Sequence, residues 1–509
     1  MSQIKIAKRY RILQTLGTGA PSAEPPLLAE DYLSAGKIVV LKPFRIPEQL
    51  RSDRLRLFKS LDSYLSLAHP GLASHFDLFF DQRIPTKAYS VVEYVPGKPF
   101  LPTIKSLTHS SFFDILGQLC AVLCFLHLRN HVHLDLHPNN VLLVPPNDSA
   151  CSWKLKLIDL PLLNASELLH YRDCISFSRA FSAPELQAGR SFDGRADLFS
   201  LGALLYSALV GEIPTRNPGI AELIPSLLSN EGIQIPEVTP EFLSPVIRKL
   251  LQENPDRRYS SSYFLMEDLN SNLRDHRLLL DNVNSIRMMA ESVPFIPTRA
   301  LEAGVQAIDQ WWKGDLARLS QIRISGPPGA GKSRLSKSLK LYAKIVGAVA
   351  GEIDIKSNGD ADLILDATTG QKRDPEPQFQ EVAGHLALIF NETESKCNAN
   401  TLSSIRSEKG ISLMAITILR RKPSAQIVQH ELFESELPLN LTGLDAQQSQ
   451  TFLDKVLLPN SLVPTLKESI SGIALAMPGL MADQVLALIH SGSISRSGPL
   501  WSASRINKM

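Results

Sequence analysis

The sequence contains little cysteine, no long hydrophobic run and almost no net charge. Five cysteines in 509 residues show no metal-like spacing, which argues against a structural zinc site and favours a reducing compartment. No stretch approaches the roughly 18 unbroken apolar residues of a membrane span, and the start of the chain lacks the apolar run of a secretion signal. Because the net charge is only +2, we expect no chain-wide electrostatic contact with nucleic acid. These absences predict a soluble, cytoplasmic protein with no membrane span and no nucleic-acid partner.

The sequence does have the composition and length of several globular domains. It is 44% hydrophobic and 20% charged, as globular proteins are. At roughly 100–200 residues per domain, the chain accommodates about two to four domains. We therefore do not expect a single fold.

The most informative stretch is His131–Leu143, which contains Asp135 and, five residues later, Asn140. A carboxylate can orient a hydroxyl nucleophile, and an amide oxygen can hold a magnesium ion. The stretch resembles the catalytic loop of protein kinases, and the resemblance implies that Asp135 is the base and Asn140 a metal ligand. The family usually has arginine at Leu134 and lysine at His137. We therefore count His137 among the catalytic candidates, in the place of a stronger cation.

The segment before this loop resembles the ATP-binding half of a kinase. Tyr10–Gly19 looks like a first strand followed by the glycine-rich loop, where Gly17 and Gly19 let backbone amides approach the phosphates of ATP. An apolar strand at Ile38–Phe44 carries Lys42, which resembles the kinase lysine that binds the α- and β-phosphates.

Two further features of this half are expected around the nucleotide. The usual partner of the kinase lysine is a glutamate on the next helix, but that position falls at Ser60, with the shorter Asp62 close by. Ser90–Gly97 looks like the kinase hinge. The resemblance implies that the backbone at Glu93 and Val95 bonds the adenine edge.

Two motifs after the catalytic loop complete the expected site. Lys154–Pro161 alternates like a strand and carries Asp159, which matches the kinase aspartate that bridges magnesium to the phosphates. Pro161 replaces the usual glycine of that motif and restricts φ. Ser178–Glu185 resembles the end of the activation segment, with Ser178 at the threonine that contacts the catalytic aspartate.

Three later residues separate protein kinases from small-molecule phosphotransferases, which share the His-x-Asp-x-x-x-x-Asn loop. Glu185 and Arg258 match a structural ion pair of protein kinases, and Asp197 matches the aspartate that braces the catalytic loop. These residues favour a protein kinase and disfavour a small-molecule kinase.

The second half of the chain carries a complete G-x-x-x-x-G-K-S motif, preceded by an apolar strand and followed by a helical pattern. The backbone of a loop containing Gly326, Gly329 and Gly331 is expected to cradle phosphates. Lys332 would reach the terminal phosphate, and Ser333 would hold magnesium.

The segments that follow resemble bacterial ATPase domains of the STAND type, which are related to AAA proteins. Gly384–Glu392 falls at their acidic strand, Ile411–Arg420 at their sensor strand, and Ala476–Leu480 at a turn of their helical lid. The magnesium-binding aspartate of that strand is replaced by Asn391. Asp366 is the rival candidate for the role.

The resulting architecture is an α+β bilobal protein-kinase fold followed by an α/β P-loop NTPase domain with a small helical lid. The expected boundaries are a kinase domain at 8–275, a linker at 276–295, a P-loop ATPase domain with its lid at 296–495 and a tail at 496–509.

These resemblances imply a serine/threonine protein kinase that uses ATP and Mg²⁺ in signal transduction and acts on a protein substrate or signalling partner. A different class of function stays open: a pseudokinase scaffold regulated by the nucleotide state of the P-loop domain. This alternative is favoured by the altered glycine-rich loop, by Ser60 in place of the helix glutamate, and by Leu134, His137 and Pro161. STAND-type domains commonly assemble when bound to ATP, so an ATP-dependent oligomer through that domain is a further expectation of the family.

Overall fold

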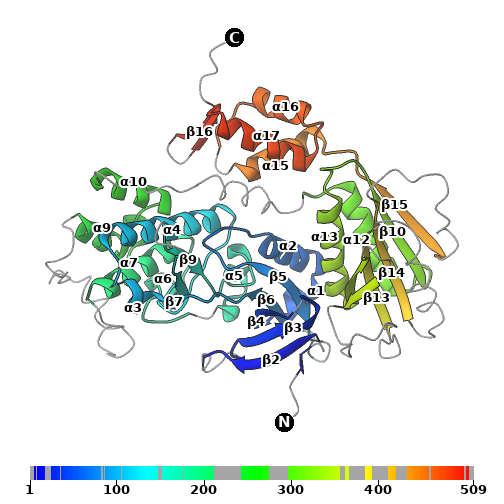
Figure 1. Cartoon of the computed structure of the whole chain (residues 1–509), viewed down its shortest axis with the longest axis horizontal. Coiled ribbons are helices and arrows are strands. Elements are labelled where there is room, and N and C mark those ends of the chain that lie inside the picture. Colours follow the sequence, from blue (N-terminus) through cyan, green and yellow to red (C-terminus); the bar gives the residue numbers. More distant parts are fainter. Residues whose placement is uncertain are drawn as a thin grey trace.

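The computed structural model describes residues 5–210, 242–273, 296–355, 361–365, 384–391, 411–419 and 433–503, apart from short gaps inside these ranges. The gaps lie at residues 7–8, 18–23, 35, 82–83, 85, 105, 147–151, 176, 458–459 and 498–499. The expected linker at 276–295 lies outside the described residues. Figure 1 shows a two-lobed N-terminal unit, a second unit built on a separate sheet, and a small helical unit above both.

The first lobe is a six-stranded antiparallel sheet in the order β1-β2-β3-β4-β6-β5. Its strands are β1 (Lys5–Ile6), β2 (Tyr10–Thr15), β3 (Leu27–Asp31), β4 (Lys37–Arg45), β5 (His75–Phe80) and β6 (Lys87–Glu93). Val39 and Leu41 alternate inward along β4, as expected for a strand with one buried face. Strand β1 lies before residue 8 and pairs with β2 at the edge of the sheet.

Two helices and a 3₁₀ turn accompany this sheet: η1 (Tyr32–Ser34), α1 (Glu48–Ser52) and α2 (Arg54–Leu65). Asp53 caps α2 by accepting a hydrogen bond from the Arg56 backbone N–H at 3.1 Å. Leu57, Leu61 and Tyr64 recur at helical spacing and are buried, so one face of α2 packs into the lobe.

The second lobe is mostly helical. It contains β7 (Lys98–Pro99), α3 (Phe100–Ile104), α4 (His109–Leu128), β8 (Val141–Val144), β9 (Lys154–Leu157), α5 (Ala165–His170), η2 (Arg172–Cys174), α6 (Pro184–Gln187), α7 (Arg195–Val210), α9 (Leu243–Leu250), η4 (Pro255–Arg257) and α10 (Ser262–Asn272). Strands β7, β8 and β9 form a small antiparallel sheet. The loop between α4 and β8 therefore carries the predicted catalytic stretch.

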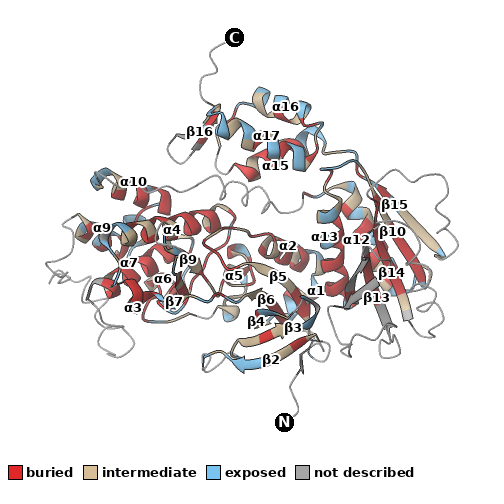
Figure 2. Ribbon diagram, in the orientation of Figure 1, coloured by how far each residue is buried: buried red, intermediate tan, exposed pale blue. Residues whose placement is uncertain are grey.

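Helix α4 is the one helix of the described residues that is long and apolar enough to cross a membrane, over Ser110–Leu128. The bent pair α16 and α17 would be a second only if both helices formed one span. Of the α4 window, 67% is buried inside the protein. Figure 2 shows α4 in the middle of the helical lobe, where it forms the core.

The second unit is built on a sheet in the order β12-β11-β13-β14-β10-β15. Its elements are α12 (Arg299–Lys313), β10 (Leu319–Ser325), α13 (Lys332–Val346), β11 (Val349–Ile355), β12 (Ala361–Leu365), β13 (Gly384–Asn391), β14 (Ile411–Ile418) and β15 (Ser435–Asn440). All pairs are parallel except β11 with β12. Helix α13 packs on this sheet. The central strands of the sheet are continuous runs of buried apolar residues, such as Leu386–Ile389.

The small helical unit contains α15 (Ala446–Val456), α16 (Pro464–Ile473), α17 (Pro478–His490), β16 (Ile494–Ser497) and β17 (Leu500–Ala503). Strands β16 and β17 form an antiparallel hairpin. Trp501 is buried in the same apolar cluster as the three helices. The predicted tail from residue 496 was therefore wrong, because the indole closes the core of this unit.

Candidate active site of the two-lobed unit

The backbone of the catalytic loop is held by a buried carboxylate. Leu134 has a φ of 61°, a conformation that is strained for a side chain with a Cβ. Asp197 at the start of α7 accepts hydrogen bonds from the backbone N–H of Leu134 at 2.7 Å and of His133 at 2.9 Å. His127 lies 2.8 Å from the same carboxylate through Nε2. Asp197 is placed as the sequence predicts, and it stabilises the strained turn beside Asp135.

This bracing predicts an acid-dependent loss of stability. Burial alone would raise the pKa of Asp197, but the hydrogen bond from His127 and the contacts with His133 outweigh burial and lower the pKa. Its stabilising contribution is complete above the unfolded value of about 3.9 and is lost as the pH falls through the lower folded value. We expect Asp197→Asn to reduce the free energy of unfolding at pH 7 by about 1–3 kcal/mol. The deficit should shrink below pH 4 in denaturant titrations; a pH-independent deficit would contradict the assignment.

Asp135 lies at the centre of the loop and is contacted from three sides. Its Oδ1 accepts from the Ser178 backbone N–H at 2.7 Å, and its Oδ2 lies 3.6 Å from His137 Nε2. Asn140 Nδ2 donates to the Asp135 carbonyl at 2.9 Å. Burial would raise the pKa of Asp135, but His137 and the Ser178 N–H outweigh it and lower the pKa. The carboxylate is therefore ionised at neutral pH.

Ser178 and His137 both lie beside Asp135, as predicted. The contact from Ser178 to Asp135 is made by the backbone N–H. His137 lies beside Asp135, where a cationic support was expected. A backbone donor needs no particular side chain, which explains why serine serves in the threonine position.

Lys42 and Asp159 face one another across the cleft between the lobes. The Lys42 ammonium lies 3.3 Å from Asp159 Oδ1, and both side chains are part-exposed. Asp159 has a φ of 66°, which aspartate tolerates better than most residues. The Ile158 N–H donates to the Asn140 carbonyl at 3.0 Å, which places Asp159 next to Asn140. The structure thus brings together the residues predicted to bind phosphate and magnesium.

The helix acid that would normally pair with Lys42 is absent, as expected from the sequence. Ser60 is buried, and its hydroxyl accepts from the Asn164 N–H at 3.4 Å. Asp62 pairs with Arg334 at 2.6 Å. Asp159 therefore takes the role of the carboxylate partner of Lys42, and Asp62 does not replace the missing glutamate.

The predicted hinge follows β6. The Glu93 N–H donates to the Ser74 carbonyl at 2.8 Å, so this donor is already used within the lobe. Burial would raise the pKa of Glu93, but the Ser74 N–H and Lys156 outweigh it and lower the pKa. Among the described residues, no acceptor contacts the Val95 N–H. Of the two predicted hinge residues, Val95 thus has the free backbone donor.

The glycine-rich loop is described only in part. Gly17 has a φ of 71°, and the chain beside it is closed by a hydrogen bond from Leu16 N–H to the Pro26 carbonyl at 2.8 Å. This conformation favours glycine. Gly19, the other predicted phosphate-loop glycine, lies outside the described residues.

Glu185 and Arg258 form the predicted ion pair. Two guanidinium nitrogens donate to the two carboxylate oxygens at 2.7 and 2.8 Å, and the side chains are 3% and 0% exposed. Arg258 also donates to the carbonyls of Arg195, Gln252 and Glu253. The pair ties the activation-segment end to the helical lobe.

The second predicted phosphate loop connects β10 to α13. Gly326 has a φ of 147°, and a Cβ there would lie 2.6 Å from the Leu441 carbonyl oxygen, so only glycine fits. Gly331, with a φ of 89°, directly precedes α13. Gly329 also has a positive φ, and Ser333 lies in the first turn of the helix. The loop and the helix N-terminus therefore have the form that cradles phosphate.

Lys332 is folded back onto this loop. Its ammonium donates to the Gly326 carbonyl at 2.6 Å and to the Pro327 carbonyl at 2.9 Å. Burial lowers the pKa of Lys332. The Gly479 N–H donates to the Gly329 carbonyl at 3.0 Å, so the predicted lid turn does contact the loop.

Strand direction separates the two candidates for the acidic-strand position. Asn391 ends β13, which runs parallel to β14 and pairs with Ile418, at the same sheet edge as the phosphate loop. Strand β12 is antiparallel and ends at Leu365 opposite Gly351, at the other edge. Asp366 lies outside the described residues, and the strand before it leads away from the loop. The register therefore favours Asn391.

The two-lobed fold and its cleft define the class of protein. A model of the protein kinase domain matches residues 10–270, which is more than half of the chain. The chain therefore belongs to the protein kinase domain family.

Individual relatives lie within the same family. The chain is 26% identical over 332 residues to serine/threonine-protein kinase Pkn1 of Myxococcus xanthus, covering 62% of this chain and 47% of that protein. It is 31% identical over 211 residues to serine/threonine-protein kinase ULK3 of Xenopus laevis, covering 40% and 43%. It is 27% identical over 272 residues to maternal embryonic leucine zipper kinase of Xenopus tropicalis, covering 51% and 39%. The chain spans less than half the length of these curated relatives.

Proposed function

We propose that the chain transfers the γ-phosphoryl group of ATP to a serine or threonine hydroxyl of a protein substrate. The observation that carries the proposal is the convergence of Asp135, Asn140, Asp159 and Lys42 in one cleft. An ionised carboxylate, a carboxamide oxygen, a second carboxylate and an ammonium meet the needs of a hydroxyl nucleophile and of magnesium-bound phosphates. Two of the relatives are named as serine/threonine kinases, which supports the choice of hydroxyl.

Each side chain has a defined task in this reaction. Lys42 binds the α- and β-phosphates, and Asn140 and Asp159 are the residues that would hold Mg²⁺. The substrate oxygen forms a bond to the γ-phosphorus while the bond to the ADP oxygen breaks. Asp135 orients the hydroxyl and receives its proton, and His137 Nε2 lies 3.6 Å from this carboxylate.

Phosphoamino-acid analysis tests this proposal. The full chain is incubated with Mg²⁺, ATP and a basic acceptor protein, and phosphoserine and phosphothreonine are assayed. Their formation is expected, and their absence at saturating ATP would reject the kinase assignment.

The alternative function is a pseudokinase scaffold, which binds a signalling partner without catalysing transfer. One observation favours it: Lys42 has no helix carboxylate, because Ser60 occupies that position and Asp62 faces Arg334. Protein kinases need the lysine–glutamate pair in place. Nucleotide binding by the first cleft without any transfer would support the scaffold.

We further propose that the Gly326–Ser333 loop binds the phosphates of a second nucleotide in a P-loop domain of the STAND or AAA type. Its support is the glycine-shaped loop ahead of α13 and the position of β14 between β10 and β13. Because Asn391 stands at the acidic-strand position, the proposal is a nucleotide switch, with binding as its primary activity.

Two lysine variants test both nucleotide sites in the full chain. Loss of a charged hydrogen-bond donor costs about 1.5–3 kcal/mol, so Lys332→Ala and Lys42→Met should each weaken one ATP site by about 10–100-fold. Calorimetry should give two tight sites in the wild type, one tight and one weakened site in each variant, and two weakened sites in the double variant. The exposed Lys337→Ala on α13 is the matched control. Two tight sites in Lys332→Ala would reject the loop as a nucleotide site.

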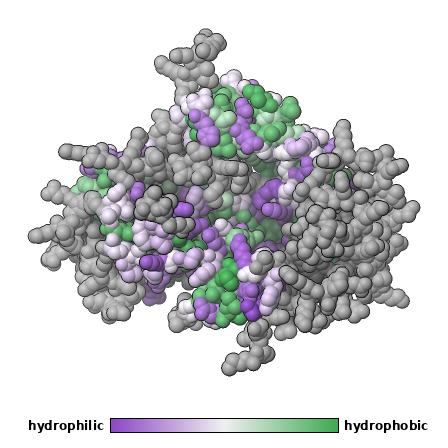
Figure 3. Space-filling model, in the orientation of Figure 1, coloured by the Kyte–Doolittle hydropathy of each residue, from purple (hydrophilic) through white to green (hydrophobic). Residues whose placement is uncertain are grey.

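The remaining parts of the proposal concern partners and compartment. Figure 3 shows hydrophobic residues gathered on the helical unit, where Val463, Ile473 and Leu475 are 55%, 64% and 71% exposed. Exposed apolar surface of this kind supports an ATP-dependent oligomer. Within the described part of the chain, Cys120 and Cys174 form no disulfide, which supports a cytoplasmic location.

A further inference from the structure

Helix α2 of the kinase unit presents an outer face that α13 of the second unit covers. Arg54, Phe58 and Asp62 lie four residues apart, so they share one side of α2. On α13, Ser338 and Tyr342 lie on one side in the same way. Figure 1 shows the two helices side by side between the two sheets.

The contacts along these faces run in opposite directions. Asp62 accepts from Arg334 Nη2 at 2.6 Å and from the Ser338 hydroxyl at 3.0 Å. One turn before Asp62 on α2 and one turn after Ser338 on α13, the rings of Phe58 and Tyr342 pack edge to face with their centroids 5.7 Å apart. Helices α2 and α13 therefore form an antiparallel pair.

Arg54 extends the contact beyond α13. It lies 3.4 Å from Asp309 on α12, and Asp309 also accepts from the Tyr342 hydroxyl at 2.9 Å. The end of α2 opposite Asp62 is thus joined to both helices of the second unit.

Burial makes the Asp62 contact specific. Asp62 is only 6% exposed. A buried carboxylate that loses its partners is strongly unfavourable. Asp62 thus joins the kinase unit to the helix that follows the phosphate loop.

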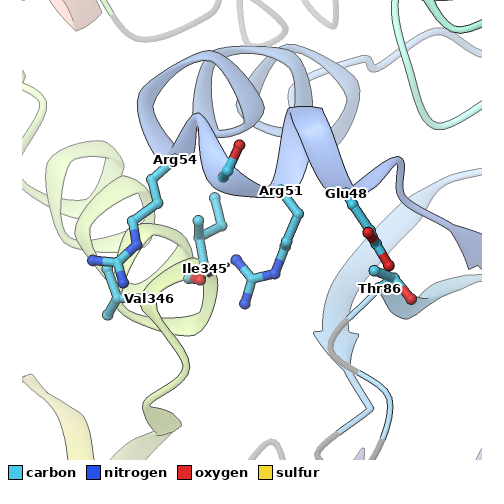
Figure 4. A pocket seen from close by; sticks show the side chains of 7 residues that line it. Glu48, Arg51, Arg54, Thr86, Ile345 and Val346 are labelled. Carbon is cyan, nitrogen blue, oxygen red and sulfur yellow. Dashed lines mark hydrogen bonds between the residues drawn. The ribbon is translucent and has the colours of Figure 1, made fainter.

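A second buried charge lies at the far end of α13. The Lys344 ammonium donates to Asp77 at 2.6 Å and to the Leu78 carbonyl at 3.0 Å, both on β5. Arg51 of α1 donates to the Ile345 carbonyl. A pocket of about 390 Å³ lies between the two units, and Arg51 and Ile345 are among the residues that line it. Figure 4 shows the side chains of Arg51 and Arg54 pointing into this pocket.

Helix α13 starts at the phosphate loop, and α2 borders the Lys42 cleft. Arg334 follows the predicted phosphate ligands by one residue. On the opposite face of α2, the Tyr64 hydroxyl contacts Ser90 Oγ at 3.0 Å, and Ser90 pairs with Lys42 in the β4–β6 register. A short series of direct contacts therefore connects the loop to the lysine of the kinase cleft.

We infer that the α2–α13 interface couples the two nucleotide sites, so that occupancy of the Gly326–Ser333 loop stabilises α2 and strengthens ATP binding at Lys42. This inference rests on the proposed nucleotide site of the second unit. Coupling between ligand sites is reciprocal, so nucleotide in the kinase cleft strengthens binding at the loop to the same degree. In a typical kinase, a glutamate on this helix would hold α2 in place by pairing with Lys42. In this protein, contacts of α13 with the opposite face of α2 hold the helix in place.

Hydrogen exchange in the full chain tests the coupling. In the Lys42→Met background the loop is the tighter site for Mg²⁺–adenylyl imidodiphosphate, and its occupancy is measured by calorimetry. We expect the nucleotide to slow exchange across residues 54–65 by at least about fivefold. The effect should disappear in both Arg334→Ala and Asp62→Ala while the loop stays occupied. Lys337→Ala, an exposed neighbour on α13, should keep it.

The outcomes separate this inference from the proposed function. An occupied loop with unchanged exchange in α2 would overturn the coupling alone. Slowed exchange that persists in both interface variants would also overturn it, because the signal would then travel by another route. No binding at the loop would overturn both the coupling and the nucleotide site. If Asp62→Ala fails to fold, Lys344→Met, which removes the second buried contact, takes its place with the same expected loss.

Discussion

Replacing Asp135 by asparagine is expected to slow phosphoryl transfer by about 10²–10⁴-fold, the range typical of a lost general base. Asparagine keeps an oxygen that can accept the Ser178 N–H, which lies 2.7 Å from the aspartate, so the loop should stay in place. Lys42 and Asp159 are untouched, so binding of Mg²⁺–ATP should change little. Initial rates with an acceptor protein, together with ATP calorimetry, separate these two effects.

The matched control for this change is Asp173→Asn, an exposed carboxylate on η2 outside the cleft. It should leave both the rate and the affinity near wild type. An Asp135→Asn protein that transfers phosphate at the wild-type rate would show that the hydroxyl is activated elsewhere. An equal loss in Asp173→Asn would point to a general effect of charge.

Replacing Arg258 by alanine is expected to lower the free energy of unfolding by about 3–5 kcal/mol, because it leaves a buried carboxylate without its partner. Glu185 is 3% exposed and cannot regain water without opening the lobe. Three backbone carbonyls lose their donor at the same time. Denaturant titration of the full chain measures the loss in its kinase-unit transition.

The neighbouring Arg257→Ala is the matched control, since Arg257 is exposed and precedes Arg258 directly. Surface changes of this kind are usually within about 0.5 kcal/mol. A loss below about 1 kcal/mol in Arg258→Ala would contradict the structural role assigned to the pair. Glu185→Ala should lower the free energy of unfolding by a similar amount, because it leaves the buried Arg258 guanidinium without its carboxylate partner.

The sequence was most informative where function depends on a few residues close together. The catalytic loop of Asp135 and Asn140 and the Gly326–Ser333 motif were recognisable because their residues follow one another at short, chemically defined intervals. The ion pair of Glu185 with Arg258 was predicted from longer spacing through the family resemblance. The structure places Asp135 beside Asn140 and pairs Glu185 with Arg258, while the role of the Gly326–Ser333 loop stays a prediction.

Contacts between distant segments were beyond the reach of sequence reasoning. Asp62 and Arg334 are 272 residues apart, and neither lies in a pattern that indicates a partner. The pairing of Lys42 with Asp159 was also missed, because the sequence analysis assigned Lys42 to the phosphates of ATP and Asp159 to magnesium. Trp501 carried no signal beyond its apolar side chain, so the final hairpin was taken for a tail.

Strand direction was another feature that local patterns did not reveal. The apolar run before Asp366 predicts a strand as well as the run before Asn391 does. Only the register, with Leu365 opposite Gly351, shows that β12 leads away from the phosphate loop. The topology therefore favours Asn391 over Asp366 as a prediction.

The most direct test of the account is transfer of labelled γ-phosphate from Mg²⁺–ATP to the chain itself and to a basic acceptor protein. Wild type, Asp135→Asn and Lys332→Ala are compared under the same conditions. The account predicts label on serine or threonine in the wild type, reduced label in Lys332→Ala and labelling slowed by about 10²–10⁴-fold in Asp135→Asn. No label in any variant, with ATP still bound in the Lys42 cleft, would contradict catalysis and leave the scaffold function.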